Sequence, residues 1–61
     1  MPNPVIINLR VEKTAEGKFV CVGNDPQFGF EVRSGERAGL FCAIGDWAHE
    51  CGIRNELVKD R

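Results

Sequence analysis

Three short stretches of the chain have the apolar patterns of strands, and a fourth follows a helical pattern. Residues 5–12 and 28–33 carry apolar side chains at every second position, which predicts strands with one buried face. Residues 18–23 are apolar on both faces, which predicts a central strand or one covered on both sides. Turn-forming residues around Gly17 and Asp25 separate the three stretches.

The stretch Glu36–Cys51 predicts the one substantial helix of the chain. Ser34 is expected as its N-cap, Glu36 suits the positive end of the helix dipole, and Gly52 is expected as the C-terminal stop. Its apolar residues recur at intervals of three and four, which forms one stripe of a helix: Leu40, Phe41, Ile44, Trp47, Ala48 and Cys51.

Two features of the C-terminal half leave alternatives open. Gly39 and Gly45 each cost about 1 kcal/mol relative to alanine inside a helix. They indicate either close packing against the sheet or a second subunit, or simple tolerance of weak helix formers. Residues 53–61 suit a short fourth strand, a last helical turn with Ile53 and Leu57 facing inward, or a frayed end.

These patterns predict a single small α+β domain over residues 1–61. It has the order β-β-β-α: an antiparallel three-stranded sheet, four-stranded if the tail adds a strand, packed by one C-terminal helix. The strand order stays open. The predicted core is Val5, Ile7, Leu9, Val11, Phe19 or Val20, Cys21 or Val22, Phe28, Phe30, Val32, Leu40 or Phe41, Ile44, Trp47 and Ala48.

Composition argues against several classes of function but does not identify one. The formal net charge is −1, from 8 Lys+Arg against 9 Asp+Glu, so we expect no nucleic-acid or polybasic membrane surface. The apolar runs are too short for a membrane span, and the N-terminus lacks the basic and apolar regions of a signal peptide. A chain of 61 residues buries a small core, which leads us to expect a homodimer.

The three cysteines and the one histidine raise two chemical alternatives. An odd cysteine count without a close pair predicts reduced thiols in a cytoplasmic protein. A zinc ion bound by Cys21, Cys42, His49 and Cys51 is the first alternative, although no Cys-x-x-Cys spacing supports it. The second is a small enzyme using Cys42 and His49 with Asp46, which share one helical face. We expect neither a cofactor nor catalysis.

The remaining candidate residues point to protein binding. Gly35–Gly39 opens the predicted helix, and Arg33 and Arg37 flank its start, where a carboxylate or phosphate could bind, although two solvated arginines are the favoured interpretation. Trp47 is either a core residue or an interface anchor, since tryptophan is enriched among binding hot spots. The residues we assign to a partner surface are Trp47, Arg33, Arg37 and Glu31.

The order of elements resembles the N-terminal half of HicB-type antitoxins, which form a partial RNase H-like module. The resemblance covers about residues 5–51 and lies in the Gly-aromatic strand at 16–22, the Asp25-Pro26 turn and Ser34-Gly35-Glu36 before the helix. Gln27-Phe28-Gly29 stands where the family has Leu-Pro-Gly, and the family's DNA-binding segment is absent. The resemblance implies a protein that neutralises a partner.

A weaker similarity is to small phage inhibitors of host RNA polymerase. Lys18-Phe19 in one strand, Phe30-Glu31-Val32 in the next and Trp47 late in the helix carry it. Both resemblances imply a non-catalytic module that neutralises or regulates a protein partner whose identity is unknown. The alternatives are a zinc-stabilised structural domain and, less favoured, the Cys/His enzyme.

Overall fold

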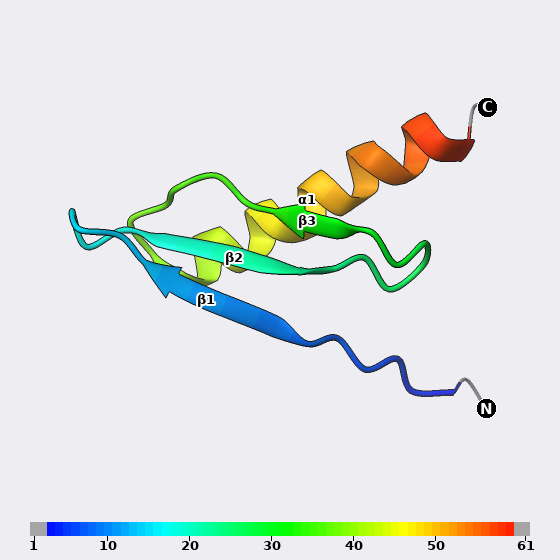
Figure 1. Ribbon diagram of the computed structural model, residues 1–61, viewed down its shortest axis with the longest axis horizontal. Helices are drawn as coiled ribbons and strands as arrows, with labels where there is room; N and C mark the ends of the chain where they lie inside the picture. Colours follow the sequence, from blue (N-terminus) through cyan, green and yellow to red (C-terminus); the bar gives the residue numbers. More distant parts are fainter. Residues whose placement is uncertain (1–2, 60–61) are drawn as a thin grey trace.

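A computed structural model describes residues 3–59, which form a three-stranded antiparallel sheet packed by one helix (Figure 1). The strands are β1 (Leu9–Lys13), β2 (Phe19–Asn24) and β3 (Glu31–Arg33), in the spatial order β1-β2-β3. The helix is α1 (Leu40–Lys59). The predicted α+β class and the central position of the second strand are confirmed. In the described residues, no helix combines the length and the apolarity needed to cross a membrane.

Helix α1 crosses one face of the sheet diagonally, over β2 and β3, and its backbone does not approach β1 (Figure 1). The buried core therefore lies between α1 and these two strands. Trp47 stands at its centre, where its Nε1–H donates to the carbonyls of Val32 (3.1 Å) and Gly23 (3.3 Å). Its fully or mostly buried members are Cys21, Val32, Ala43, Trp47 and Cys51, with Leu9, Phe19, Phe30 and Ile44 packed against them.

Gly23 is required where β1 pairs with β2. The register pairs Leu9 with Gly23, and the Leu9 side chain fills the space above the glycine. A Cβ at this position would lie 2.7 Å from Leu9 Cδ2 and 2.8 Å from the carbonyl oxygen of Asn8. Any side chain here would therefore separate β1 from β2.

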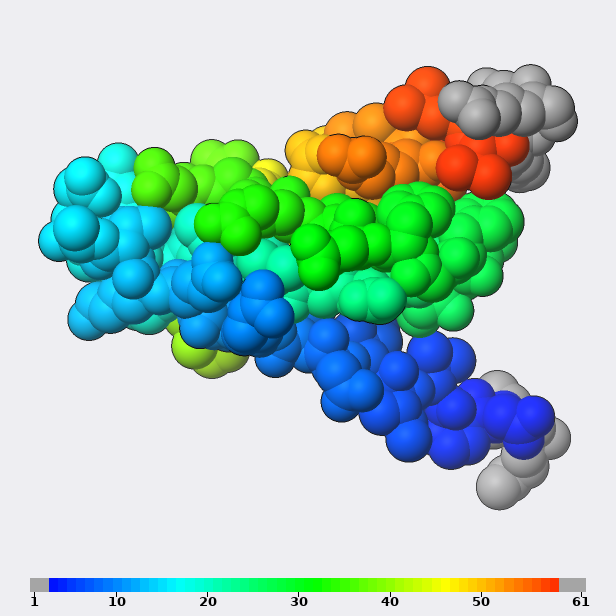
Figure 2. Space-filling view, in the orientation of Figure 1, coloured from blue at the N-terminus to red at the C-terminus, as the bar shows by residue number. Residues whose placement is uncertain are grey.

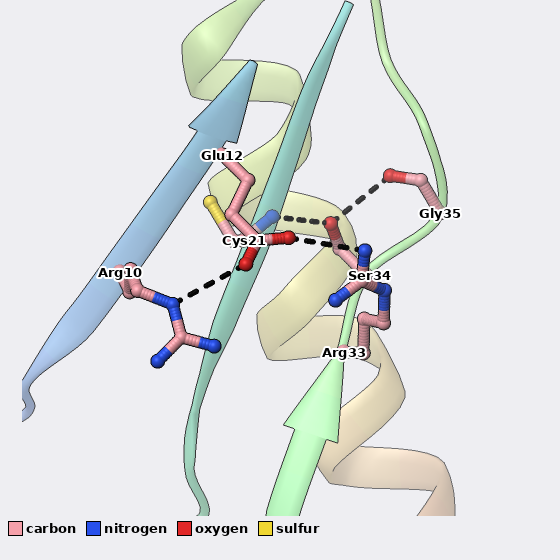
Figure 3. A network of polar contacts seen from close by, with 6 residues as sticks. All are labelled: Arg10, Glu12, Cys21, Arg33, Ser34 and Gly35. Carbon is pink, nitrogen blue, oxygen red and sulfur yellow. Dashed lines mark hydrogen bonds and ion pairs between the residues drawn. The ribbon is translucent and has the colours of Figure 1, made fainter. Parts of the chain in front are cut away.

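The strand β3 ends in a bulge that the sequence did not predict. Ser34 pairs with Cys21 in the β3 register, but the next backbone pair joins Phe19 to Arg37, so one extra residue is accommodated. The Ser34 hydroxyl accepts from the Cys21 amide at 2.8 Å and donates to the Gly35 carbonyl at 3.0 Å (Figure 3). The hydroxyl thus replaces the backbone carbonyl that a regular strand would supply.

The predicted bounds of the helix are wrong at both ends. Residues 34–37 are extended because they pair with β2, so Glu36 lies outside the helix and Ser34 is not its N-cap. The first helical hydrogen bond joins Ala43 N to the Gly39 carbonyl. Gly52 does not stop the helix, which continues through the predicted tail to Lys59, so there is no fourth strand up to that residue. Residues 60 and 61 lie outside the described range.

The glycines of the helix do not mark close packing on the sheet. A Cβ at Gly45 or Gly52 would meet no atom within 4 Å. At Gly39 the nearest atom would be the Cys42 sulfur at 3.6 Å, which belongs to the helix itself. Close packing of these glycines against the sheet is therefore wrong, whereas contact with a second subunit and simple tolerance of weak helix formers both remain predictions.

Several residues predicted for the core are exposed. Val5 is 69% exposed and Ile7 45%, and both precede β1. Because Leu9 pairs with Gly23, residue 7 lies beyond the end of β2, where the chain turns at Asp25. Val11 faces the side of the helix but lies beyond its reach. The other exposed members of the predicted core are Phe28, Leu40, Phe41 and Ala48.

Candidate functional site

The site is built on the loop between β2 and β3, which a buried carboxylate orders. Asp25 is only 3% exposed, and its Oδ2 accepts from the backbone amides of Gln27 (3.0 Å) and Phe28 (2.6 Å). An aspartate at the start of a turn commonly binds the following amides in this way. Gly29 completes the turn with φ at +83°, a conformation that favours glycine.

The same carboxylate ties the loop to the helix. Asp25 Oδ1 accepts from Asn55 Nδ2 at 2.7 Å, and Asn55 also donates to the Cys51 carbonyl. Burial alone raises the pKa of Asp25, but hydrogen bonds from Phe28, Asn55, Gln27 and the Cys51 thiol outweigh it, so the pKa lies below its ordinary value. The Asp25 hydrogen bonds therefore hold the loop and the last turns of α1 together as one corner of the molecule.

This corner presents an apolar surface that we call the hairpin–helix patch: Phe28, Phe30, Arg54, Leu57 and Val58. The two phenylalanine rings lie stacked, with their centroids 6.2 Å apart. Phe30, Arg54, Leu57 and Val58 line a shallow pocket between the loop and the helix, and Figure 2 shows these two segments in contact. Leu57 is 64% exposed and Phe28 45%. The arrangement suits an apolar side chain of another protein, with Arg54 at its margin.

A second surface, the charged face, is the side of the sheet that α1 does not cover (Figure 2). Glu12 lies between Arg33 (3.1 Å) and Arg10 (3.4 Å), and Glu31 is on the same side. The register places the stems of these side chains beside Val20 and Val22. Both valines are buried to 3% exposure although no helix lies over them.

Arg37 lies apart from Arg33 and Glu31, on the helix side of the sheet. Its guanidinium donates to Asp46 Oδ1 at 2.9 Å, while the Gly35 amide donates to Asp46 Oδ2 at 2.7 Å. These two hydrogen bonds, that of Gly35 first, hold the pKa of Asp46 below its ordinary value. The alternative of an anion site at 35–39 is not supported, because the Gly35 amide and Arg37 bind the Asp46 carboxylate and the helix begins at Leu40.

Trp47 is a core residue, which was one of its two predicted interpretations. Its side chain is 4% exposed, and its indole N–H is used within the fold. A side chain in this position does not contact a partner while the domain stays folded. We therefore remove Trp47 from the proposed partner surface.

The predicted zinc set is divided between the core and the outer surface. Cys21 and Cys51 are buried, whereas Cys42 and His49 are exposed on the outer side of α1. Within residues 3–59, no three His, Cys, Asp or Glu side chains gather to hold a metal ion. Burial raises the pKa of both buried thiols, and the nearby Asp25 carboxylate raises that of Cys51 further.

The set proposed for the enzyme alternative shares a helix but is not organised as a reactive group. Both carboxylate oxygens of Asp46 accept hydrogen bonds from the loop at 35–37 rather than from His49. Asp46 therefore serves to fasten this loop to the helix.

Sequence reasoning missed the hairpin–helix patch. Alternation in 28–33 assigned Phe28 and Phe30 to the core, and the tail that carries Leu57 and Val58 was left unassigned. The Asp25-Pro26 turn was correctly placed, but its bond to Asn55 joins residues 30 positions apart. The sequence does carry a signal for the helical half of the patch, because Arg54, Leu57 and Val58 continue the spacing of three and four residues after Cys51.

Comparison with known proteins supplies no family. No protein-family model matches the chain, and neither a curated protein nor a solved structure matches it. The resemblances to HicB-type antitoxins and to phage inhibitors therefore stay predictions from the sequence.

Proposed function

We propose that this protein is a small, non-catalytic module that neutralises or regulates a protein partner, in the manner of an antitoxin or a phage-encoded inhibitor. The observation that carries the proposal is the hairpin–helix patch. It exposes an aromatic ring and two aliphatic side chains around a shallow pocket, on a corner that the Asp25 hydrogen bonds hold together. Exposed apolar groups whose positions are fixed before binding are typical of protein-binding surfaces.

The chemistry of the patch sets the kind of partner. Leu57, Val58 and Phe28 offer apolar contact area, and Arg54 adds one positive charge at the margin. A partner segment that inserts an apolar side chain beside a carboxylate fits this surface. Glu31 and Arg33, two of the residues predicted for the partner surface, lie on the charged face, where Arg33 pairs with Glu12, so they form a surface separate from this patch.

The other functions predicted from the sequence have less support. The zinc domain requires four ligands that the fold divides between the core and the outer surface. The enzyme requires Asp46 to serve Cys42 and His49, whereas Asp46 binds the loop. A cytoplasmic location, favoured by three free thiols of which two are buried, remains part of the proposal.

The test compares two apolar-to-acidic variants by affinity capture from an extract of the organism that encodes the protein. Leu57→Asp alters the patch, whereas Phe41→Asp changes an 83% exposed residue at the other end of α1. We expect a protein that binds the wild type and Phe41→Asp but not Leu57→Asp. The captured protein is then purified and titrated by calorimetry, where Leu57→Asp should weaken binding by about tenfold or more. Equal capture by all three chains would overturn the proposal.

A further inference from the structure

The strand β1 presents a row of backbone groups to its outer side. Thr14 N donates to the Lys18 carbonyl at 2.8 Å, one step beyond the β1–β2 register. Hydrogen-bonded pairs alternate along antiparallel strands, so the amides and carbonyls of Arg10 and Glu12 face β2. Those of Leu9, Val11 and Lys13 therefore face outward. No strand among the described residues pairs with this edge.

This edge carries charged side chains at three of its five positions but none of the other usual structural protections. Edge strands of monomeric proteins are commonly very short, bulged, interrupted by proline, or covered by a helix or loop. β1 has five residues, contains no proline, and is not approached by α1. Val11, on the helix side, is 43% exposed. The edge thus carries both free backbone groups and an uncovered apolar residue.

The charges of β1 identify the strand that would fit this edge. If a second β1 pairs antiparallel with Val11 on the two-fold axis, each Arg10 stands opposite the Glu12 of the other copy. A shift of one copy by two residues places Arg10 opposite Arg10, or Glu12 opposite Glu12. A Leu9-centred register leaves Arg10 opposite Asn8, without a charge pair. Among these, only the Val11-centred register pairs Arg10 and Glu12 with opposite charges, while Lys13 stands opposite Leu9.

We propose that β1 binds β1 of a second copy of this chain in the Val11-centred register, which joins two three-stranded sheets into one. Leu9, Val11 and Lys13 supply the backbone hydrogen bonds between the copies. Val11 packs against its equivalent, and the Arg33–Glu12–Arg10 ion pairs of each charged face continue into those of the other copy. This surface differs from the hairpin–helix patch, so its test is independent of the proposed function.

Opposite charge reversals test the register by sedimentation velocity at about 100 μM protein, a concentration suited to micromolar affinity. We expect a wild-type dimer. Arg10→Glu places two like pairs across the axis, and so does Glu12→Arg, so each variant should dimerise roughly tenfold or more weakly. An equimolar mixture of the two restores both attractive pairs. In the mixed dimer, positions 10 and 12 are both acidic in one copy and both basic in the other. We expect the mixture to form a heterodimer.

Val11→Pro tests the backbone pairing directly. The Val11 amide faces outward, so proline removes a hydrogen bond between copies and leaves the β1–β2 bonds in place. The expected result is a folded monomer, judged by circular dichroism, while Val11→Thr remains a dimer.

Three results would overturn the proposal. The first is a wild-type monomer at this concentration. The second is a dimer that neither charge reversal weakens, which would place the contact elsewhere or in the Leu9-centred register. The third is a mixture of the two charge variants that stays monomeric.

Discussion

The two edge strands of this sheet, β1 and β3, differ in how readily each could pair with a further strand. At β3 the strand is three residues long and ends in a bulge, where the Ser34 hydroxyl accepts the hydrogen bond that a backbone carbonyl would have accepted and Asp46 binds the Gly35 amide. At β1 the strand runs straight and its outer backbone groups are left without a partner strand among the described residues. The first edge resists further pairing, whereas the second favours it.

The helix explains why the edges differ. α1 lies over β2 and β3, and Trp47 donates to a carbonyl of each strand. β1 is held mainly by its pairing with β2 and by Leu9 over Gly23. Stability is therefore concentrated on the β3 side of the molecule. The surfaces free for binding are the β1 edge and the corner at the end of α1.

The largest effect is expected from Trp47→Ala, which removes the centre of the helix-covered side. Truncating a buried tryptophan typically costs about 3–5 kcal/mol, comparable to the whole stability of a domain this small. We expect the variant to be unfolded at 25 °C by circular dichroism. Val11→Ala, on the β1 side, should lower the free energy of unfolding by less than about 1 kcal/mol in urea titrations of the monomer. A folded Trp47→Ala variant would contradict this division of stability.

Ser34→Ala should have the next largest effect, since it attacks the bulge at the end of β3. The variant leaves the Cys21 amide, which belongs to a residue with 0% exposure, without its acceptor. An unsatisfied buried donor costs roughly 1–3 kcal/mol in unfolding free energy. Urea denaturation measures the loss, and Ser34→Thr, which keeps the hydroxyl, serves as the control. Equal stabilities of Ser34→Ala and the wild type would show that the hydroxyl is not needed.

The layout of this fold follows from local patterns. Val20, Cys21 and Val22 are consecutive apolar residues, which predicts a central strand or one covered on both faces, and β2 is central. Ile44 and Trp47 lie on the inner side of the helix, as their spacing predicts. These features depend on neighbours in the sequence, so a single chain reveals them.

The features that were mispredicted depend on distant contacts. Residues 34–37 carry helix signals, but the pairing of Arg37 with Phe19 keeps them extended. Gly52 resembles a helix stop, but the contacts of Cys51 with the core and of Asn55 with Asp25 favour continuing the helix past it. The candidate site also depends on a distant contact, because the hydrogen bond between Asn55 and Asp25 brings the loop and the helix together. No local pattern contains that bond.

A smaller effect is expected from acid, and it acts on the two carboxylates that fasten loops to the helix. Asp25 and Asp46 have pKa values below the ordinary 3.8 in the folded chain. The unfolded chain therefore binds more protons at low pH, so the stabilisation is present above about pH 4 and is lost as the pH falls through the folded pKa values. Urea midpoints at pH 7 and about pH 3 measure this loss.

The matched variants for acid separate the two loops. Asp25→Asn should be less stable than the wild type at neutral pH and lose less on acidification, because one of the titrating groups is gone. Asp46→Asn should show the same flattening and should also speed hydrogen exchange at the amides of Gly35 and Arg37, which border the bulge. A pH profile that both substitutions leave unchanged would assign the acid sensitivity to other groups.

The smallest effect is expected from Val5→Asp, in the exposed segment before β1. Val5 belongs to an alternating apolar pattern, but it precedes the first residue paired with β2 and is 69% exposed. We expect the free energy of unfolding to change by less than about 0.5 kcal/mol in urea titrations. The β1–β1 dimer should also survive, because the Val11-centred register uses residues 9–13. In a Leu9-centred register, position 5 would stand opposite Lys13, and an aspartate there would strengthen dimerisation. An increase in dimer affinity in the Val5→Asp variant would therefore favour the longer pairing over the one proposed.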